Sequence, residues 1–264
     1  MSAAAKPAST TPILTIAEGK ATIRLNRPAE HNRLEPADLE ALIEIYDRIA
    51  NDVSIRVLVI TGTGKSFSSG FHIGALKERK EGKQKDYDPN AFEKMTDKLE
   101  DLRVPTIAAL NGGVYGGSTD LALACDFRIG VETTRMFMPA TRLGIVYYQS
   151  GLRRYVSRLG LNNAKRLFLT AAPVEANELL GMGYLSEIVP ADQLMTRVDA
   201  LASELAANAP LALAATKKAL NDVAAGRLDP AWHDAARIAC AKSEDHQEGL
   251  RAWAEKRKPV FQGR

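Results

Sequence analysis

Residues 105–126 read PTIAALNGGVYGGSTDLALACD. The stretch predicts a strand over 106–110, a glycine turn, and a helix that begins at about Gly117 and carries Asp120 in its first turn. The first N–H groups of a helix have no partner inside it and, with the aligned peptide dipoles, they favour negative charge. Glycines also let a ligand approach this backbone closely. The segment therefore predicts a place where an oxyanion is held beside a proton-transfer group.

A second glycine turn has the same setting. Residues 67–73, FSSGFHI, come shortly after a strand that is predicted over 56–61. If the two turns converge, each contributes one backbone N–H, and such a pair is what an oxyanion hole requires. The alternative is that both are ordinary connecting turns.

Strands and helices alternate through the first two thirds of the chain, which indicates an α/β protein. From residue 191 onward the pattern becomes helical. The other elements predicted from spacing and turn residues are strands over 13–16 and 21–25 joined at Glu18-Gly19, helices over 36–50 and 89–102, and later helices starting at Pro210, Pro230 and after Ser243. The charged segment 77–86 predicts a mobile surface loop or a frayed helix end, and residues 1–11 predict a disordered tail.

Charge and cysteine content narrow the function classes. The chain has 264 residues and a formal net charge of +3, too small to indicate binding to nucleic acid or to an anionic membrane. Without an apolar run of about 18 residues or a targeting pattern, the sequence predicts no membrane span and a cytoplasmic location. Cys125 and Cys240 are predicted to be buried free thiols. With the four histidines they show no close metal-ligand spacing, so no metal site is predicted.

Five segments in order carry a resemblance to a known family. They are residues 25–34, 64–73, 105–128, 169–185 with Val189-Pro190 shortly after, and 255–261. On these motifs the chain resembles the enoyl-CoA hydratase/isomerase (crotonase) family from about Ile13 to Phe261.

The resemblance implies a fold, a substrate class and an assembly. The fold is an α/β, crotonase-type spiral of ββα units over residues 12–190, followed by a helical C-terminal region, 191–264, that builds a homotrimer or a hexamer of two trimers. The substrate is an acyl-CoA, with coenzyme A present only as part of the substrate and no other cofactor. By position, the backbone N–H groups of Phe71 and Gly117 bind the thioester oxygen.

The chain departs from the family's hydratases at their two glutamates. The first of these positions holds Asp120, which is one methylene shorter. The second holds Ala140, after Pro139, and an alanine transfers no proton. Because adding water to a double bond needs one group to activate water and one to deliver a proton, the ordinary two-glutamate mechanism is in doubt. Asp120 stays the first candidate for proton transfer, against the alternative that it only caps its helix.

Two tyrosines stand where small residues are usual in the family. Tyr147 and Tyr148 bring phenols that can donate a hydrogen bond or a proton, and they are candidates to assist Asp120. Tyr147 aligns with a tyrosine of the family's methylmalonyl-CoA decarboxylase branch, which also resembles residues 243–259. That branch has histidine where this chain has Phe71, so the match is incomplete. The alternative for both tyrosines is packing with an exposed hydroxyl.

Coenzyme A contacts are carried over only where the motifs match. The candidates are His31, Arg33, Ser69, Phe71, His72, Ile73 and Lys258. For each of the cations the alternative is a solvated surface residue.

The leading hypothesis is an acyl-CoA enzyme that works through a thioester enolate. Isomerisation of a double bond, hydration by an altered site and decarboxylation all remain open, and decarboxylation needs no base for an α-proton. A hypothesis of another class is a scaffold that binds acyl-CoA without catalysis. Ala140 supports this hypothesis, because it stands at a catalytic glutamate position and transfers no proton.

Overall fold

A computed structural model describes residues 11–72, 74 and 88–264. The predictions for the tail up to residue 10, for the segment 77–86 and for the CoA contact of Ile73 lie outside these described residues.

The larger of two sheets contains six strands among the described residues, in the order β1-β2-β3-β5-β7-β10. The strands are β1 (Ile13–Ala17), β2 (Lys20–Leu25), β3 (Val57–Gly62), β5 (Thr106–Leu110), β7 (Phe127–Val131) and β10 (Glu187–Val189). β1 and β2 form the predicted hairpin, and the turn residues Glu18 and Gly19 both have positive φ. The other neighbours pair in parallel.

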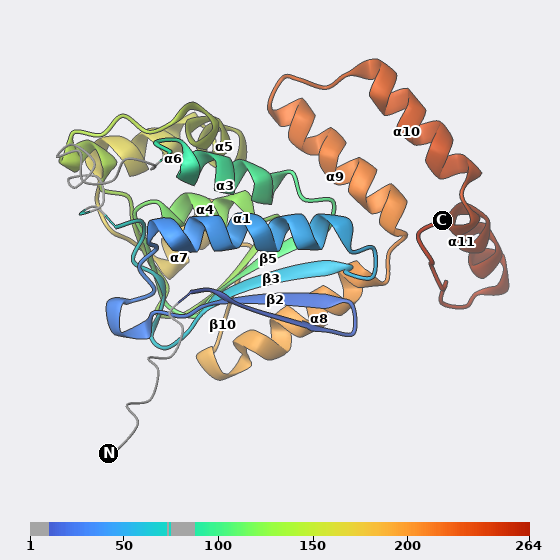
Figure 1. Ribbon diagram of the computed structural model, residues 1–264, viewed down its shortest axis with the longest axis horizontal. Coiled ribbons are helices and arrows are strands. Elements are labelled where there is room, and N and C mark those ends of the chain that lie inside the picture. The colour runs from blue at the N-terminus through green and yellow to red at the C-terminus, as the bar shows by residue number, and fades with distance from the viewer. Residues whose placement is uncertain (1–10, 73, 75–87) are drawn as a thin grey trace, which may run out of the picture.

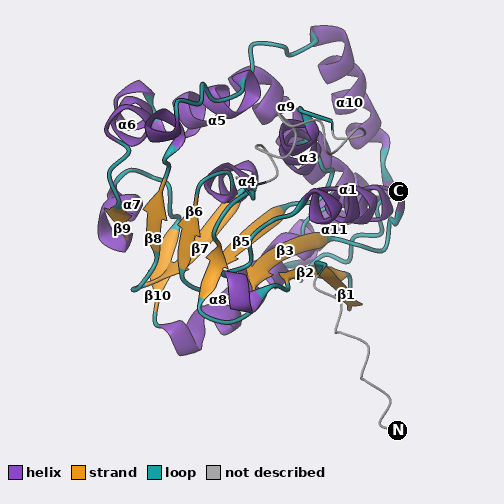
Figure 2. Ribbon diagram, turned by 60° about the vertical axis from the view of Figure 1, so that its left-hand side comes forward, coloured by secondary structure: helices purple, strands orange, loops and turns teal. Residues whose placement is uncertain are grey.

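The smaller sheet lies beside it and has the order β4-β6-β8-β9. Its strands are β4 (Ser66–Ser68), β6 (Gly113–Tyr115), β8 (Arg135–Phe137) and β9 (Val174–Glu175). β3, β5 and β7 are each followed by a short strand of this second sheet, and β4 pairs in parallel with β6 and β6 with β8. This repetition, visible in Figure 2, confirms the predicted α/β spiral of ββα units.

Helices cover both faces of the larger sheet (Figure 2). The helices are α1 (Pro36–Asn51), α3 (Ala91–Glu100), α4 (Ser118–Ala124), α5 (Gln149–Leu159), α6 (Leu161–Lys165), α7 (Ala176–Gly181), α8 (Leu194–Ala206), α9 (Pro210–Ala224), α10 (Pro230–Lys242) and α11 (Glu244–Glu255). The short helical turns are η1 (Pro28–Glu30), η2 (Ala140–Leu143), η3 (Arg166–Thr170) and η4 (Ala191–Gln193). α8 packs Leu194, Val198 and Ala202 against one face, and the main core lies on the other.

The last three helices stand apart from these layers (Figure 1). α10 has no fully buried residue, and α11 begins at the predicted cap, where the hydroxyl of Ser243 accepts the His246 N–H at 3.0 Å. α9 is tied to the sheet by Lys217, whose Nζ donates to the carbonyl of Val104 at 2.8 Å and to Oδ2 of Asp126 at 2.7 Å. α9 thus joins the C-terminal helices to the rest of the chain, also through Asn221, whose Nδ2 donates to the carbonyl of Glu100 at 3.0 Å.

Both cysteines are free, as predicted. Cys125 is buried, and burial raises the pKa of its thiol to about 12. Cys240 is only partly buried, which corrects the prediction of two buried thiols. In the described part of the chain, no helix combines the length and the apolar character needed to cross a bilayer.

Replacing Lys217 with alanine should destabilise the protein, because Asp126 loses its nearly buried cationic partner. We expect the free energy of unfolding to fall by about 1.5–3 kcal/mol, the range for hydrogen bonds to charged groups. The measurement is urea denaturation, with Lys94→Ala as the control. The pair of Lys94 with Asp88 is exposed, so its loss should cost less than about 1 kcal/mol. Equal effects of the two substitutions would contradict the assignment.

Candidate active site

The two glycine turns meet at the ends of neighbouring strands. β4 and β6 pair in parallel, and each strand leads into one of the turns. The hydroxyls of Ser68 and Ser118 are hydrogen-bonded at 2.6 Å across the junction. A methyl group added to Gly70 would lie 2.6 Å from the carbonyl oxygen of Tyr115 and 3.3 Å from the backbone nitrogen of Gly117. The backbones of the two turns are therefore in close contact at this junction.

Glycine is needed at this junction for both conformation and space. Gly70 has φ +94°, a left-handed conformation that other residues rarely adopt. Gly117 precedes α4, and its N–H donates to no acceptor in the described residues. A methyl group on Gly117 would lie 2.8 Å from Cζ of Phe92, whose ring also packs edge-on against Phe71 with centroids 6.0 Å apart. Phe92 therefore forms an apolar wall beside both turns.

Asp120 lies in the first turn of α4, where its N–H donates to the carbonyl of Gly117 at 3.0 Å. Its side chain has no exposed surface. Nε of Arg154 donates to Oδ1 at 3.0 Å, and Nη2 donates to Oδ2 at 2.8 Å. The hydroxyl of Tyr148 also donates to Oδ2. The predicted proton-transfer group is therefore a buried, ion-paired carboxylate whose neighbour on the site side is a phenol.

Tyr147 and Tyr148 form a stacked pair, with ring centroids 4.2 Å apart. The Tyr147 hydroxyl donates to the Tyr148 oxygen at 3.2 Å. Burial raises the pKa of both phenols well above the ordinary value, and the Asp120 carboxylate raises them further. Both hydroxyls stay protonated at neutral pH, so a chain of hydrogen bonds runs from Tyr147 through Tyr148 to Asp120. A methyl group on Gly151 would lie 2.5 Å from the Tyr147 ring, so a glycine is needed there.

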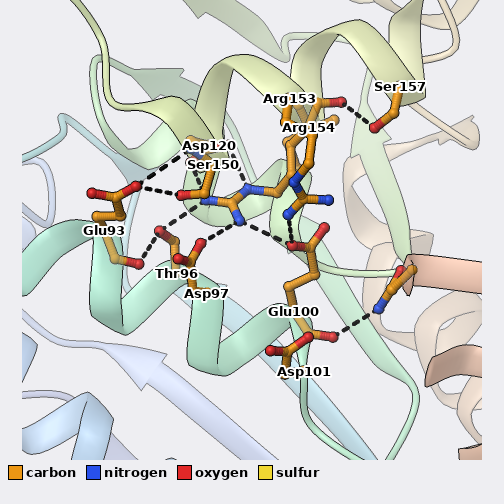
Figure 3. Close-up of polar contacts among 12 residues, drawn as sticks. Glu93, Thr96, Asp97, Glu100, Asp101, Asp120, Ser150, Arg153, Arg154 and Ser157 are labelled. Atoms are coloured by element: carbon orange, nitrogen blue, oxygen red, sulfur yellow. Dashed lines mark hydrogen bonds and ion pairs between the residues drawn. The ribbon is translucent and has the colours of Figure 1, made fainter. Parts of the chain in front are cut away.

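Ala140 is buried at the start of η2 and brings only a methyl group to the position of the second family glutamate. Another carboxylate, Glu93 of α3, points toward the start of α5, as Figure 3 shows. Its Oε1 accepts a hydrogen bond from the Ser150 hydroxyl at 2.8 Å. Glu93 thus helps to join α3 to α5.

Sequence reasoning missed the charged cluster behind Asp120 (Figure 3). The Arg154 cluster consists of three arginines and three carboxylates: Arg153, Arg154, Arg158, Asp97, Glu100 and Asp120. Burial raises the pKa of Glu100, but the neighbouring arginines outweigh burial and hold it below the ordinary value. The sequence does contain a signal for this cluster. Residues 97 and 100 are spaced to share one face of a helix, and residues 154 and 158 are spaced to share one face of another helix. That signal does not say which faces meet.

Some CoA-binding candidates gather around the start of α1. Nδ1 of His31 lies 3.0 Å from the hydroxyl of Ser66, and the Ser69 N–H donates to the carbonyl of His31 at 2.7 Å. The Ser69 hydroxyl donates to the carbonyl of Glu30 at 3.0 Å. η1 and the glycine turn of residues 67–73 are therefore held together.

Glu35 connects two further candidates. Arg33 Nε donates to Oε1 at 2.7 Å, and Nδ1 of His72 lies 2.9 Å from Oε2. Burial raises the pKa of Glu35, but these hydrogen bonds lower it more, so the net pKa lies below the ordinary value. Lys258 follows α11, which lies at the other end of the molecule from this group (Figure 1). Within one chain, Lys258 does not join the other candidates.

Comparisons with known proteins identify related sequences and a related fold. The sequence model of the family Enoyl-CoA hydratase/isomerase matches residues 15–264. The chain is 33% identical over 247 residues to the short-chain-enoyl-CoA hydratase of Clostridium acetobutylicum. The match covers 91% of this chain and 94% of that protein. The chain is 32% identical over 245 residues to the 2,3-dehydroadipyl-CoA hydratase of Escherichia coli, covering 92% and 94%.

A solved structure extends the likeness to three dimensions. The crystal structure of an enoyl-CoA hydratase/carnithine racemase from Magnetospirillum magneticum has a TM-score of 0.90 and 26% identity, and the match covers 97% of each chain. The fold is that of a family of enzymes that process acyl-CoA thioesters. The chain belongs to the enoyl-CoA hydratase/isomerase family.

Replacing Gly70 with alanine should disrupt the junction of the turns. The new methyl group meets backbone atoms of the other turn, at residues 115–117. We expect turnover of acyl-CoA to fall by about 100-fold or more, the cost of losing one oxyanion donor. The measurement is steady-state turnover of whichever acyl-CoA the native protein consumes.

Gly183→Ala is the matched control for this substitution. Gly183 also has positive φ, but a methyl group there would meet nothing within 4 Å. It should cost stability of about 1–2 kcal/mol and leave turnover unchanged. A folded Gly70→Ala protein with native turnover would contradict the proposed meeting of the turns.

Proposed function

We propose that this protein converts an acyl-CoA thioester through an enolate whose oxygen is held by the backbone N–H groups of Phe71 and Gly117. The observation that carries the proposal is the close approach of the two glycine turns, with the position of a Gly70 methyl group 3.3 Å from the Gly117 nitrogen. Among the described residues the N–H of Gly117 has no acceptor, and the ring of Phe92 packs beside Gly117.

The proposed reaction depends on the movement of one electron pair onto the thioester oxygen. When a bond to the carbon next to a thioester breaks, its electron pair moves onto the thioester oxygen and gives an enolate. Two fixed donors at about 2.7–3.1 Å stabilise that negative charge, and they need no reorganisation during the reaction. The proton or the carboxyl group that leaves the α-carbon decides which reaction is observed.

Proton transfer at this site is assigned to the pair of Tyr148 and Asp120, with Tyr147 assisting. Tyr148 donates to the buried carboxylate and accepts from Tyr147. When Tyr148 takes a proton from substrate or water, its own proton passes to Oδ2 of Asp120. The pair can therefore act as one base, although the site lacks a carboxylate at position 140.

Decarboxylation is a second candidate, and the pairing of Asp120 with Arg154 favours it. Both oxygens of this carboxylate already accept hydrogen bonds from the arginine. The other position holds Ala140, which brings no carboxylate, and Asp120 is fully buried. Loss of CO₂ from a malonyl-type thioester breaks a C–C bond and needs no base, and the enolate then takes one proton at its α-carbon.

Coenzyme A is assigned to the surface around the start of α1. His31, Arg33, Ser69 and His72 lie together there, next to the turn that carries Phe71. The hydrogen-bonding groups suit a nucleotide and a pantetheine chain, and Arg33 suits a phosphate. Lys258 serves this role only if it is supplied by another copy of the chain. A cytoplasmic location remains part of the proposal.

The test is a panel of acyl-CoA compounds in D₂O: butyryl-, crotonyl-, 3-butenoyl- and methylmalonyl-CoA. We expect at least one to acquire deuterium at the α-carbon, because an enolate is protonated from solvent. The products are identified by mass and NMR. Hydration adds 20 mass units in D₂O, isomerisation keeps the carbon skeleton, and decarboxylation of methylmalonyl-CoA gives propionyl-CoA with one α-deuterium.

Tyr148→Phe separates proton transfer from binding in the same assay. It should keep the dissociation constant for the acyl-CoA and lose most of the exchange, about 10²-fold or more. If the native protein binds acyl-CoA but none of the panel exchanges or reacts, the chain is a binding scaffold and the enzymatic proposal is wrong.

The assembly proposed is a homotrimer, or a hexamer made of two trimers. α9, α10 and α11 leave a groove of about 870 Å³ between them, lined mostly by apolar side chains. Leu220 is 65% exposed and Leu250 is 58% exposed on this surface, which is unusual for leucines of a folded monomer that lie together. A second copy of the chain would cover them.

Light scattering after size-exclusion chromatography should give three or six times 28.7 kDa. Leu220→Lys places a charge on the apolar surface and should shift the mass toward one chain. Leu180→Lys is the control, since this leucine is exposed on α7 outside the groove. A native mass of one chain would refute the proposed assembly.

A further inference from the structure

Arg154 is the most completely satisfied charged side chain near the site. It has no exposed surface, and its five N–H donors make five hydrogen bonds. Two go to Asp120; the others go to Asp97 at 2.7 Å, to Glu100 at 3.1 Å and to the hydroxyl of Thr96 at 3.1 Å. A guanidinium with every donor used cannot rotate without breaking several of these bonds.

The contact with Asp120 is bidentate. Nε and Nη2 form one edge of the planar guanidinium, and each binds a different carboxylate oxygen, at 3.0 and 2.8 Å. Such a fork fixes the plane of the carboxylate as well as its position, and a lysine has no equivalent geometry. Burial lowers the pKa of Arg154, but Asp120 and Glu100 raise it more, so the arginine stays charged.

The fixed carboxylate in turn orients Tyr148. Because Oδ2 of Asp120 accepts from the Tyr148 hydroxyl, the phenolic hydrogen points to the carboxylate, and the Tyr148 oxygen accepts from Tyr147 at 3.2 Å. Thr96 reinforces the arrangement, since its hydroxyl oxygen lies 3.2 Å from the Tyr148 oxygen and accepts from Arg154. The direction of the whole hydrogen-bond chain is therefore set from its buried end.

We propose that Arg154 is a positioning residue for the reaction: it locks Asp120 so that Tyr148 presents its oxygen, and not its hydrogen, toward the substrate. This inference rests on the proposed enolate chemistry and adds a specific role for a side chain that itself does not touch the substrate. The rest of the Arg154 cluster balances the charge that this lock brings into the core.

The test compares Arg154→Lys with Arg153→Gln in the acyl-CoA assay. The lysine keeps the charge but loses the fork, so kcat should fall by about 10- to 100-fold, the cost of about 1 Å of misplacement. KM should change by less than about 3-fold, because no substrate contact is removed. Arg153 sits next to it on α5 and contacts Glu100 but not Asp120. Its substitution should lower stability and leave kcat unchanged.

A double-mutant cycle separates positioning from a merely structural role. If Arg154 acts through Tyr148, then Arg154→Lys should have no further effect on kcat in a Tyr148→Phe background. Independent effects that multiply would overturn the inference, as would native kcat in a folded Arg154→Lys protein. If Arg154→Lys does not fold, Thr96→Val is used in its place. In that variant kcat should also fall while KM stays constant, and an unchanged kcat overturns the proposal.

The outcomes distinguish this inference from the function on which it rests. Absence of α-exchange and of product formation by the native protein refutes the proposed function. Native exchange that is insensitive to position 154 refutes only the positioning role.

Discussion

The structure depends on the parallel pairing of two very short strands, β4 and β6. This pairing sets the two glycine turns against each other and leaves no room for a side chain at Gly70. The larger sheet holds the pair in register, because β3 and β5, which precede them in the chain, are themselves parallel neighbours. The proposed site of backbone N–H groups is therefore held by the same hydrogen bonds that hold the sheets.

Local sequence signals were sufficient for much of the fold. The hairpin at Glu18-Gly19 and the strand 106–110 were predictable because their signals lie within a few residues. The strands of the smaller sheet were not, since β4, β6 and β8 are three residues long and have no period to read. Their existence followed only from the resemblance to a family, which supplies long-range pairing that spacing does not contain.

The same limit applies to the candidate site. The sequence pointed to Asp120 and to the two tyrosines, yet it could not say that a buried arginine 34 positions away binds both oxygens of the carboxylate. It also gave Lys258 as a CoA contact, and it could not say that α11, which precedes Lys258, lies at the far end of the molecule from His31 (Figure 1). Both points depend on which elements lie next to each other in space. Such long-range neighbours cannot be read from local sequence patterns.

The even balance of the Arg154 cluster restricts how this lineage can evolve. Three positive and three negative groups share the region behind α4, and removing one partner of a buried pair costs about 3–5 kcal/mol, a large part of the stability of a typical domain. A single replacement at the buried residues Glu100, Asp120 or Arg154 therefore leaves an unpaired charge in the core, whereas a compensated pair of changes keeps the balance.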